Sequence, residues 1–526
     1  MTARYRVSKI CRKALRFRRA EAGGVALMFA LAMPAVSVMA LASVDLHRAS
    51  TVRMNLQDAL DSATLAAARS AYNDDIHLTE IGLATLRANM QAYPNTSLVE
   101  NQVSFTLNTN GAVVSSAKAR VDTIAANMFL GRDIDVGAGA EVMRSNSRIE
   151  LAMVIDNTGS MRWDGKLRAA QDAASNLVRR LAAAAARSSE PDAVRISVVP
   201  FSQTVRIGTQ YQNATWMDGS AQAEGNDYMF QGGANRLALF NRLRTSWAGC
   251  VESRPYPYDT LDTAPTSSNR PTKFVHYFAP DEPDVGDWWR SGDYSDWDRN
   301  YRVDNNYLDD GLAATNANKD WDKRSRRTQK YDNSADFSGG RGPNRGCTIE
   351  PVSRLTTDYN ALLRSIDNMV ADGNTNIPMG LVWGWHTLSP NTPFGDGLPY
   401  GEPRLKKIAI LMTDGENVND VYPNPNRARY AGVGYIGEQR LGVGTASSGQ
   451  QRRDAMDSRL AETCRNMQAR DITIYTVGVG VDTRTQDLLR SCATGQGKFF
   501  NVSGASGIAD AFDSIAGSIE TLRISR

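Results

Sequence analysis

Three oxygen-bearing side chains stand at alternate positions directly after an apolar stretch. Residues 149–155 read Ile-Glu-Leu-Ala-Met-Val-Ile, and the turn that follows carries Asp156, Thr158 and Ser160. Hard divalent cations prefer oxygen ligands, and a turn at a strand end can direct several of them to one point. Taken alone, the same pattern is also common as a helix cap and turn. The turn therefore predicts half of a cation site, and a complete site needs further ligands from elsewhere in the chain.

Two later segments supply further oxygen atoms. Thr375 lies in the polar stretch 372–377, before an apolar helix that we expect to begin near Pro378, a favourable residue in a first helical turn. Asp414 ends the buried strand expected at 408–412. Ligands of doubly wound sheets bind at the carboxyl ends of strands. We therefore expect these two segments to reach the edge at which the first turn lies.

The elements around these residues alternate between strand and helix patterns. Short, nearly continuous apolar runs are typical of parallel strands that are buried on both faces. Such strands are expected at 149–155, 194–199, 408–412 and 472–477. Amphipathic helices are expected at 165–186 and over the last stretch, 508–522, because apolar residues recur there at helical spacing. The alternation predicts an α/β domain with a doubly wound, mostly parallel sheet.

The amino-terminal 44 residues combine a basic tail with an apolar stretch. Residues 1–21 hold eight basic residues and one acidic residue, and residues 22–44 hold no charged residue. About 20 apolar residues in a helix cross a bilayer core of roughly 30 Å. The basic flank predicts a cytoplasmic tail, with everything after the membrane anchor outside the cytoplasm. A cleaved signal peptide, with 40–42 as its cleavage triplet, is the alternative.

The remaining segments complete a six-part organisation. Residues 45–147 predict a small α+β module, beginning with a helix at 45–72 whose inward stripe repeats at three- and four-residue steps. The α/β domain then falls into two parts, 148–203 and 351–526. The segment 204–350 is too long for a connection inside a compact domain and is interpreted as a solvated insertion. The stripe of the first helix is Leu46, Ala49, Val52, Leu56, Leu60, Ala63 and Ala67.

Four of the five cysteines follow the apolar stretch, where disulfides can persist. Four cysteines allow three pairings. We favour Cys250 with Cys347 and Cys464 with Cys492, because each pair closes within one segment. Zinc binding is the competing interpretation, but there is no Cys-x-x-Cys pair and the chain has only four histidines.

Neither catalysis nor nucleic-acid binding is indicated. No general base or activated nucleophile stands near the candidate site, and His386 is interpreted as a structural residue on a helix. Residues 432–437 match a dinucleotide fingerprint, but they follow a polar stretch instead of a strand, which favours a loop. The net charge of +3 carries no strong nucleic-acid footprint. A metal-dependent hydrolase remains as a minor alternative.

The complete ligand pattern resembles the metal-ion-dependent adhesion site (MIDAS) of von Willebrand factor A domains. The matching residues are Asp156, Thr158 and Ser160, then Thr375, then Asp414 within Thr-Asp-Gly. The first hydroxyl is Thr where the family more usually has Ser, which keeps the oxygen atom. The resemblance implies a divalent cation, most simply Mg²⁺ with Mn²⁺ or Ca²⁺ as alternatives. It also implies a protein partner whose carboxylate completes the coordination of the cation.

The amino-terminal segment resembles TadG-like proteins of Flp or Tad pilus assembly. The resemblance is carried by residues 23–31, Asp45, 57–63 and 65–68, with further pieces as far as 388–390. It implies a single-pass protein of the bacterial inner membrane, with its bulk periplasmic or surface-exposed. Pilus assembly components are the partners that it implies, and cell adhesion or pilus assembly is the function. An envelope stress or chaperone-like A-domain protein unrelated to pili is the alternative.

Overall fold

The computed structural model describes most of the chain after the basic tail 1–21, which lies outside the described residues. The described residues are 22–70, 72, 74–93, 96–108, 111–131, 133–143, 147–186, 188, 190–230, 234–283, 304–309, 325–424 and 426–524. Residue contacts divide the chain into two compact units, residues 1–145 with residue 526, and residues 146–525. Each unit has its own hydrophobic core and is described by itself.

Helix α2 (Ala22–Arg69) is the longest element of the first unit, with 48 residues. Side chains of its charge-free part point outward: Leu31 is 74% exposed and Met39 is 66% exposed. Within the described residues, α2 is the helix that is long and apolar enough to cross a membrane. The apolar helix expected at 22–44 is therefore present, and it runs without a break into the segment that follows.

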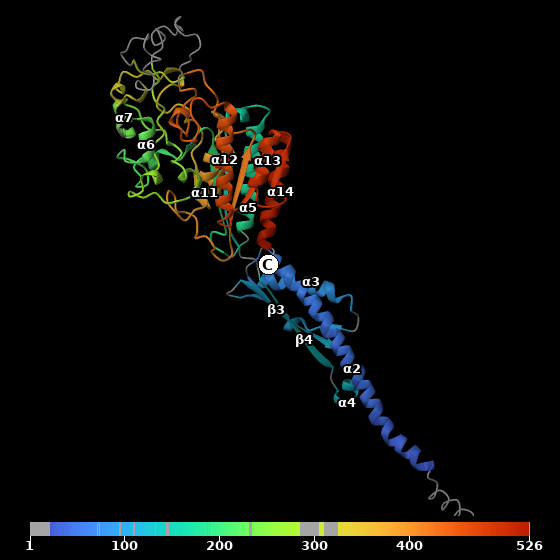
Figure 1. Ribbon diagram of the computed structural model, residues 1–526. Helices are drawn as coiled ribbons and strands as arrows, with labels where there is room; N and C mark the ends of the chain where they lie inside the picture. Colours follow the sequence, from blue (N-terminus) through green and yellow to red (C-terminus); the bar gives the residue numbers. More distant parts are fainter. Residues whose placement is uncertain are drawn as a thin grey trace, which may run out of the picture. The chain divides into compact units, whose positions relative to one another are not determined.

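The second half of α2 is the spine of a small α+β module (Figure 1). Leu56 and Leu60 are fully buried against helix α3 (Asp75–Met90) and against Phe105 of the sheet. Leu46, which the sequence placed on the same stripe, is instead 72% exposed, whereas its neighbour Asp45 is buried.

A four-stranded antiparallel sheet completes the module. Its strands are β1 (Thr96–Leu98), β2 (Ser104–Leu107), β3 (Ala112–Val121) and β4 (Ile134–Met143). Strand β3 pairs with the other three. Burial alternates along β3, as the sequence pattern predicts for a half-buried strand. A 3₁₀ turn, η1 (Glu100–Gln102), precedes β2, and helix α4 (Ala125–Leu130) connects β3 to β4.

The second unit is built on a six-stranded sheet, and it confirms the α/β fold class. The strands are β5 (Arg148–Asp156), β6 (Val194–Phe201), β9 (Ser353–Thr356), β10 (Leu405–Thr413), β11 (Thr473–Val479) and β12 (Phe499–Val502). Their order is β12-β11-β10-β5-β6-β9. All neighbours are parallel except β9, which pairs antiparallel with β6 at the edge. The chain therefore winds outward in both directions from β5 and β10.

Helices cover both faces of this sheet (Figure 1). One face packs against α5 (Lys166–Ala186), α10 (Tyr359–Asp367) and α14 (Ile508–Ile524). The other face packs against α11 (Ile377–Leu388), α12 (Gly449–Gln468) and α13 (Thr483–Cys492). Burial on both faces explains why β5 and β10 are apolar at nearly every position.

The described part of the 204–350 segment does not form the solvated insertion expected from its sequence. It contributes Trp247, Tyr277 and Tyr331, all fully buried, to the same core as α11 and the sheet. Its rings pack edge to face, as in the pair Phe240–Phe278 with centroids 5.0 Å apart. Aromatic side chains each bury a large area, so scattered rings build a core without any periodic pattern. Its regular elements are short: β7 (Val205–Arg206), β8 (Cys250–Val251), α6 (Glu224–Met229) and α7 (Arg236–Arg242).

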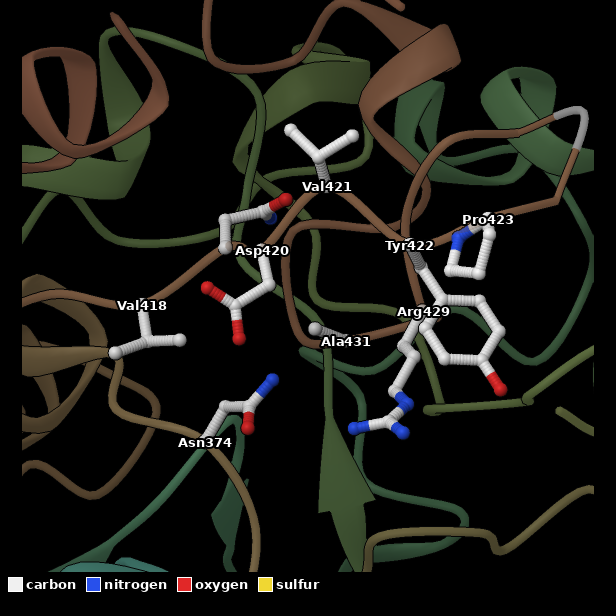
Figure 2. Close-up of a pocket in the computed structure, with 9 residues that line it drawn as sticks. Asn374, Val418, Asp420, Val421, Tyr422, Pro423, Arg429 and Ala431 are labelled. Carbon is white, nitrogen blue, oxygen red and sulfur yellow. The ribbon is translucent and has the colours of Figure 1, made fainter. Parts of the chain in front are cut away.

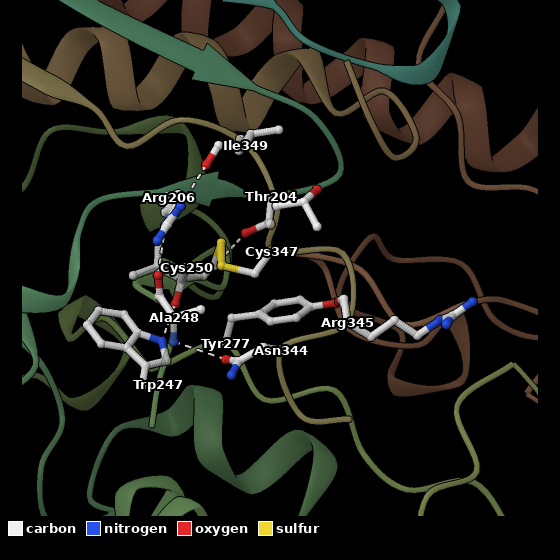
Figure 3. Close-up of a disulfide and its surroundings, with 12 residues drawn as sticks. Thr204, Arg206, Trp247, Ala248, Cys250, Tyr277, Asn344, Arg345, Cys347 and Ile349 are labelled. Carbon is white, nitrogen blue, oxygen red and sulfur yellow. Dashed lines mark hydrogen bonds between the residues drawn. A yellow bond between two sulfur atoms is a disulfide. The ribbon is translucent and has the colours of Figure 1, made fainter. Parts of the chain in front are cut away.

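Both cysteine pairs favoured from the sequence are bonded in the structure. Cys250–Cys347 closes 97 residues, and Cys464–Cys492 closes 28 residues between α12 and α13. Figure 3 shows how hydrogen bonds surround the first bond. Asn344 Oδ1 accepts from the backbone N–H of Ala248 at 3.0 Å, and Trp247 Nε1 donates to the carbonyl of Cys250 at 2.6 Å. The stretches of chain around Cys250 and Cys347 are thereby held together beside β7.

Candidate metal centre

The first part of the centre is the turn that leaves β5. Asp156 is the last residue of the strand, and its side chain is fully buried. Its Oδ1 accepts the backbone N–H of Thr158 at 2.8 Å, which folds the turn back over the strand end. The hydroxyl oxygens of Thr158 and Ser160 lie 3.0 Å apart, at the start of the 3₁₀ turn η2 (Gly159–Arg162). The alternate spacing of Asp156, Thr158 and Ser160 thus places their side-chain oxygen atoms on one side of the turn.

The second part comes from β10, the parallel neighbour of β5. Ile155 and Met412 are register partners, so the two strands end at the same edge of the sheet. Ser160 Oγ donates to Asp414 Oδ1 at 2.6 Å. Thr413 Oγ1 donates to Asp156 Oδ2 at 2.6 Å, and Thr413 was not assigned a role from the sequence. Each carboxylate is therefore oriented by a hydroxyl from the other strand end.

The third part is the loop before α11, which brings Thr375 to the same edge. Gly373 lies in this loop, and its carbonyl accepts the N–H of Gly159 at 2.9 Å, which ties the loop to the first turn. Ser160 Oγ and Thr375 Oγ1 each lie 3.9 Å from the point where a Cβ on Gly415 would stand. The structure thus brings together all five residues that the sequence nominated.

The two carboxylates of the centre have different electrostatic surroundings. Burial, together with the nearby charge of Asp414, raises the pKa of Asp156 to about 6. Lys166, the first residue of α5, places Nζ 2.8 Å from Asp414 Oδ2. Its side chain is 19% exposed, whereas that of Asp414 is fully buried. Sequence reasoning missed Lys166, whose only signal is its place at the start of a helix ten residues after Asp156.

The donor set fits a hard divalent cation. It consists of two carboxylates and three hydroxyls, and all five are oxygen donors of the kind that Mg²⁺ prefers. Over the described residues, no group of three His, Cys, Asp or Glu side chains forms a metal cluster. A cation at this centre would therefore rely on hydroxyls, waters and an incoming anion to complete its coordination.

A hollow of about 350 Å³ lies beside the Thr375 loop (Figure 2). Asn374 and Asp420 face each other across it, and Arg429 lies on its other side, 4.5 Å over the ring of Tyr422. The fully buried Arg452 holds this rim, because its Nη1 donates to the carbonyl of Asp420 at 2.9 Å. The surface next to the centre is thus concave, polar and held in place from beneath.

The other sequence candidates do not contribute to a site. His386 is fully buried on α11 beside Phe274 and Trp383, and burial holds the pKa of its imidazole well below the ordinary value. This agrees with a structural role. Residues 432–437 lead into the short 3₁₀ turn η9 (Ile436–Glu438), with no strand directly before them. That loop lacks the strand-to-helix context of a dinucleotide site.

One family model matches the amino-terminal segment of the chain. Residues 23–70 match the family model described as putative Flp pilus-assembly TadE/G-like, which confirms the expected resemblance of that segment. No curated protein matches the chain.

Among solved structures, the chain is similar to the von Willebrand factor domain of Mfa5, a type V pilus tip protein of Porphyromonas gingivalis. The identity is 12% and the TM-score 0.33, over 72% of this chain and 97% of that one. It is also similar to the adhesive tip pilin GBS104 of Group B Streptococcus agalactiae, at 12% identity and a TM-score of 0.32, over 71% and 100%. The pilus adhesin SpaC of Lactobacillus rhamnosus GG matches at 10% identity and a TM-score of 0.31. That match covers 81% of this chain, which spans about a third (34%) of SpaC.

Proposed function

We propose that this protein is a membrane-anchored component of Flp or Tad pilus assembly or surface adhesion. In this proposal its second unit docks a protein partner through a divalent cation held by Asp156, Thr158, Ser160, Thr375 and Asp414. The observation that carries the proposal is the convergence of these five oxygen donors at the carboxyl edge of the sheet. They come from three chain segments, and the hydrogen bond from Thr413 to Asp156 joins residues 257 positions apart.

The chemistry of the centre favours docking over catalysis. A bound Mg²⁺ supplies a positive centre with open coordination positions, which a carboxylate from a partner can occupy. Asp156 and Asp414 provide the negative charge, and the three hydroxyls provide neutral oxygen atoms. Thr413 and Lys166 hold the two carboxylates in place from behind. No general base is proposed, because the residues around the centre are used in holding the site together.

The first unit supports a membrane location. Residues 22–44 of α2 would cross the inner membrane, with the basic tail 1–21 in the cytoplasm and the second unit in the periplasm or at the surface. The two disulfides are compatible with a compartment outside the cytoplasm. The TadE/G-like match of residues 23–70 favours pilus components as partners over the stress or chaperone-like alternative.

Metal titration of conservative variants tests the centre. Asp156→Asn and Asp414→Asn keep the side-chain shape and remove one charge each, so Mn²⁺ affinity measured by calorimetry on the full chain in detergent should fall by about 100-fold. Asp420→Asn is the matched control, because Asp420 is an exposed acid on the neighbouring rim and should leave the affinity unchanged. Mn²⁺ affinity that is equal in all three variants and the wild type would refute the site.

A second experiment identifies the partner. A photocrosslinking residue at Asn374, on the rim of the hollow, should capture a pilus component in intact cells, and a chelator or Asp414→Asn should abolish the capture. Capture that persists unchanged in both cases contradicts metal-dependent docking. Capture of a chaperone client in place of a pilus component supports the alternative function.

A further inference from the structure

Helix α4 is tied to α2 at the residue where the charge-free stretch ends. Asp45 is the first charged residue after 22–44. Its carboxylate accepts the backbone N–H groups of Ile124, Ala125 and Ala126 at 2.8, 2.6 and 3.1 Å. These are donors that the start of a helix leaves unsatisfied, so the side chain of α2 caps α4. The level of α4 along α2 is thereby fixed.

Hydrogen bonds also hold the end of the β3–β4 connection that leads into β4. Asp133 Oδ1 accepts from Asn127 Nδ2 at 3.1 Å and from the N–H of Thr123 at 3.3 Å. Gly131 ends α4 with a φ of 64°, a left-handed conformation that glycine adopts without strain. The short helix is therefore held at both ends and displays a defined outer side.

Two apolar side chains lie on that outer side. Helix α4 reads AANMFL and contains no charged residue. Met128 is 74% exposed and Ile124 is 41% exposed. A single exposed apolar side chain on a soluble protein needs no explanation. Here, however, the adjoining turn of α2 also presents Leu46, at 72% exposure, and Val44, at 43%. The apolar surface of the anchor thus continues past Asp45 onto α4.

The level of this surface matches the boundary of a bilayer. At 1.5 Å per residue, residues 22–44 extend over about 34 Å, close to the roughly 30 Å of a hydrocarbon core. Asp45 then lies where the core meets the headgroups. Its three hydrogen bonds to α4 satisfy the carboxylate there, which removes most of the cost of placing it beside lipid.

We propose that α4 lies in the outer interface of the bilayer that α2 spans, with Ile124 and Met128 in the boundary between headgroups and acyl chains. The inference rests on the membrane anchor of the proposed function. The occupant of this apolar surface is lipid, because the surface is continuous with the spanning part of α2. Two contacts, one through α2 and one through α4, fix the tilt of the module against the membrane.

Site-specific labelling of the full chain in vesicles of phosphatidylethanolamine and phosphatidylglycerol tests this placement. In a Cys11→Ser background, an environment-sensitive fluorophore is attached to Met128→Cys, Val36→Cys or Ile76→Cys. Val36 lies inside the span and is 58% exposed. Ile76 is the matched control, since it is 79% exposed on α3, which follows the far end of α2. Arg69 is 24 positions after Asp45, which puts that end about 36 Å beyond the boundary.

The readout is quenching by nitroxide-bearing lipids, together with the emission maximum of the label. The nitroxide lies near the headgroup for positions 124, 128 and 76, and deep on the acyl chain for position 36. We expect quenching at position 128 to exceed that at position 76 several-fold, with a blue-shifted emission. Adding Met128→Asp to a chain labelled at Ile124→Cys should reduce the quenching at position 124 several-fold, because a carboxylate is excluded from that depth.

Two results would overturn the inference, and they are distinguishable. Quenching at 36 but equal, low quenching at 128 and 76 refutes the placement of α4 and leaves the anchor intact. This is also the result expected if a partner protein, absent from these vesicles, covers α4. An unquenched label at 36 refutes the anchor itself, and the inference fails with it.

Discussion

The ion pair between Lys166 and Asp414 makes a quantitative prediction about how a cation and the fold are coupled. Lys166 Nζ lies 2.8 Å from Asp414 Oδ2, and the Asp414 side chain is fully buried. Lys166→Met keeps most of the side-chain length but removes the ammonium. Without a cation, the buried carboxylate then has no positive partner from α5. With a bound divalent cation, the metal takes over that neutralisation.

The magnitude follows from the burial of the two partners. Breaking a buried ion pair by removing one partner costs about 3 to 5 kcal/mol. Because Lys166 is 19% exposed, we expect the low end, about 3 kcal/mol in chelator. In saturating Mg²⁺ the loss should shrink to about 1 kcal/mol, as for an exposed pair. The difference of about 2 kcal/mol must appear as tighter metal binding, about 30-fold.

Urea unfolding of the full chain in detergent micelles, followed by tryptophan fluorescence, measures both quantities. All nine tryptophans follow residue 162, so the signal reports on the second unit. Arg168→Met is the matched control on the same helix, because Arg168 is 66% exposed in its pairs with Asp172 and Asp367. It should cost less than about 1 kcal/mol with or without metal.

A double-mutant cycle decides whether the pair itself is responsible. In an Asp414→Asn background the charge that Lys166 neutralises is absent, so Lys166→Met should then cost about 1 kcal/mol or less. The reasoning would be refuted if Lys166→Met lost the same free energy of unfolding in chelator and in Mg²⁺. It would also be refuted if the loss were as large in the Asp414→Asn background as in the wild type. Weaker Mg²⁺ binding by Lys166→Met would do the same.

Three further predictions concern the core of the second unit. Replacing Cys250 and Cys347 by alanine opens a loop of 97 residues and should lower the free energy of unfolding by about 4 to 5 kcal/mol, measured by urea titration against the disulfide-bonded wild type. Burial raises the pKa of Glu438 to about 7, so the folded state keeps a proton that the unfolded state loses above about 4.5, and stability should fall as pH rises from about 4.5 to 7. Glu438→Gln should remove this fall. Its free energy of unfolding should exceed that of the wild type by up to about 3 kcal/mol at pH 8 and equal it at pH 4, and equal pH profiles of the two proteins would contradict the raised pKa of Glu438. Gly384→Val should cost about 3 kcal/mol or more in thermal unfolding, because even a Cβ at Gly384 would stand 2.4 Å from Val154 Cγ2, and an unchanged midpoint would show that α11 can move away from β5.

The sheet and the ends of its central strands could be predicted because the information is local. Strand β5 is apolar at almost every position and stops at Asp156, and β10 behaves in the same way before Asp414. The edge strands β9 and β12 are four residues each, and their burial is only partial, so no apolar run marks them. Strand length and burial set the apolar pattern. The long buried strands could therefore be predicted from the sequence, and the short edge strands could not.

The features that escaped prediction depend on contacts between distant residues. Lys166 meets Asp414 across 248 positions, and nothing near Lys166 in the chain identifies it as part of a centre. The buried rings of the 204–350 segment, such as Tyr277 and Tyr331, gather from separate loops without periodic spacing. The capping of α4 by Asp45 joins residues about 80 positions apart. In each case the fold brings together residues that lack any local pattern.

The strand order has a consequence for how the protein folds while it is being synthesised. Strands β5 and β10 are neighbours in the middle of the sheet, yet the hydrogen bond that joins their ends spans 257 residues. A chain that emerges with its amino terminus first presents β5 and β6, both apolar on two faces, long before β10 exists to pair with β5. Such non-local pairing folds slowly and leaves strand edges open to aggregation. The nascent second unit should therefore depend on a holdase, and a stall between residues 202 and 404 should leave an insoluble fragment.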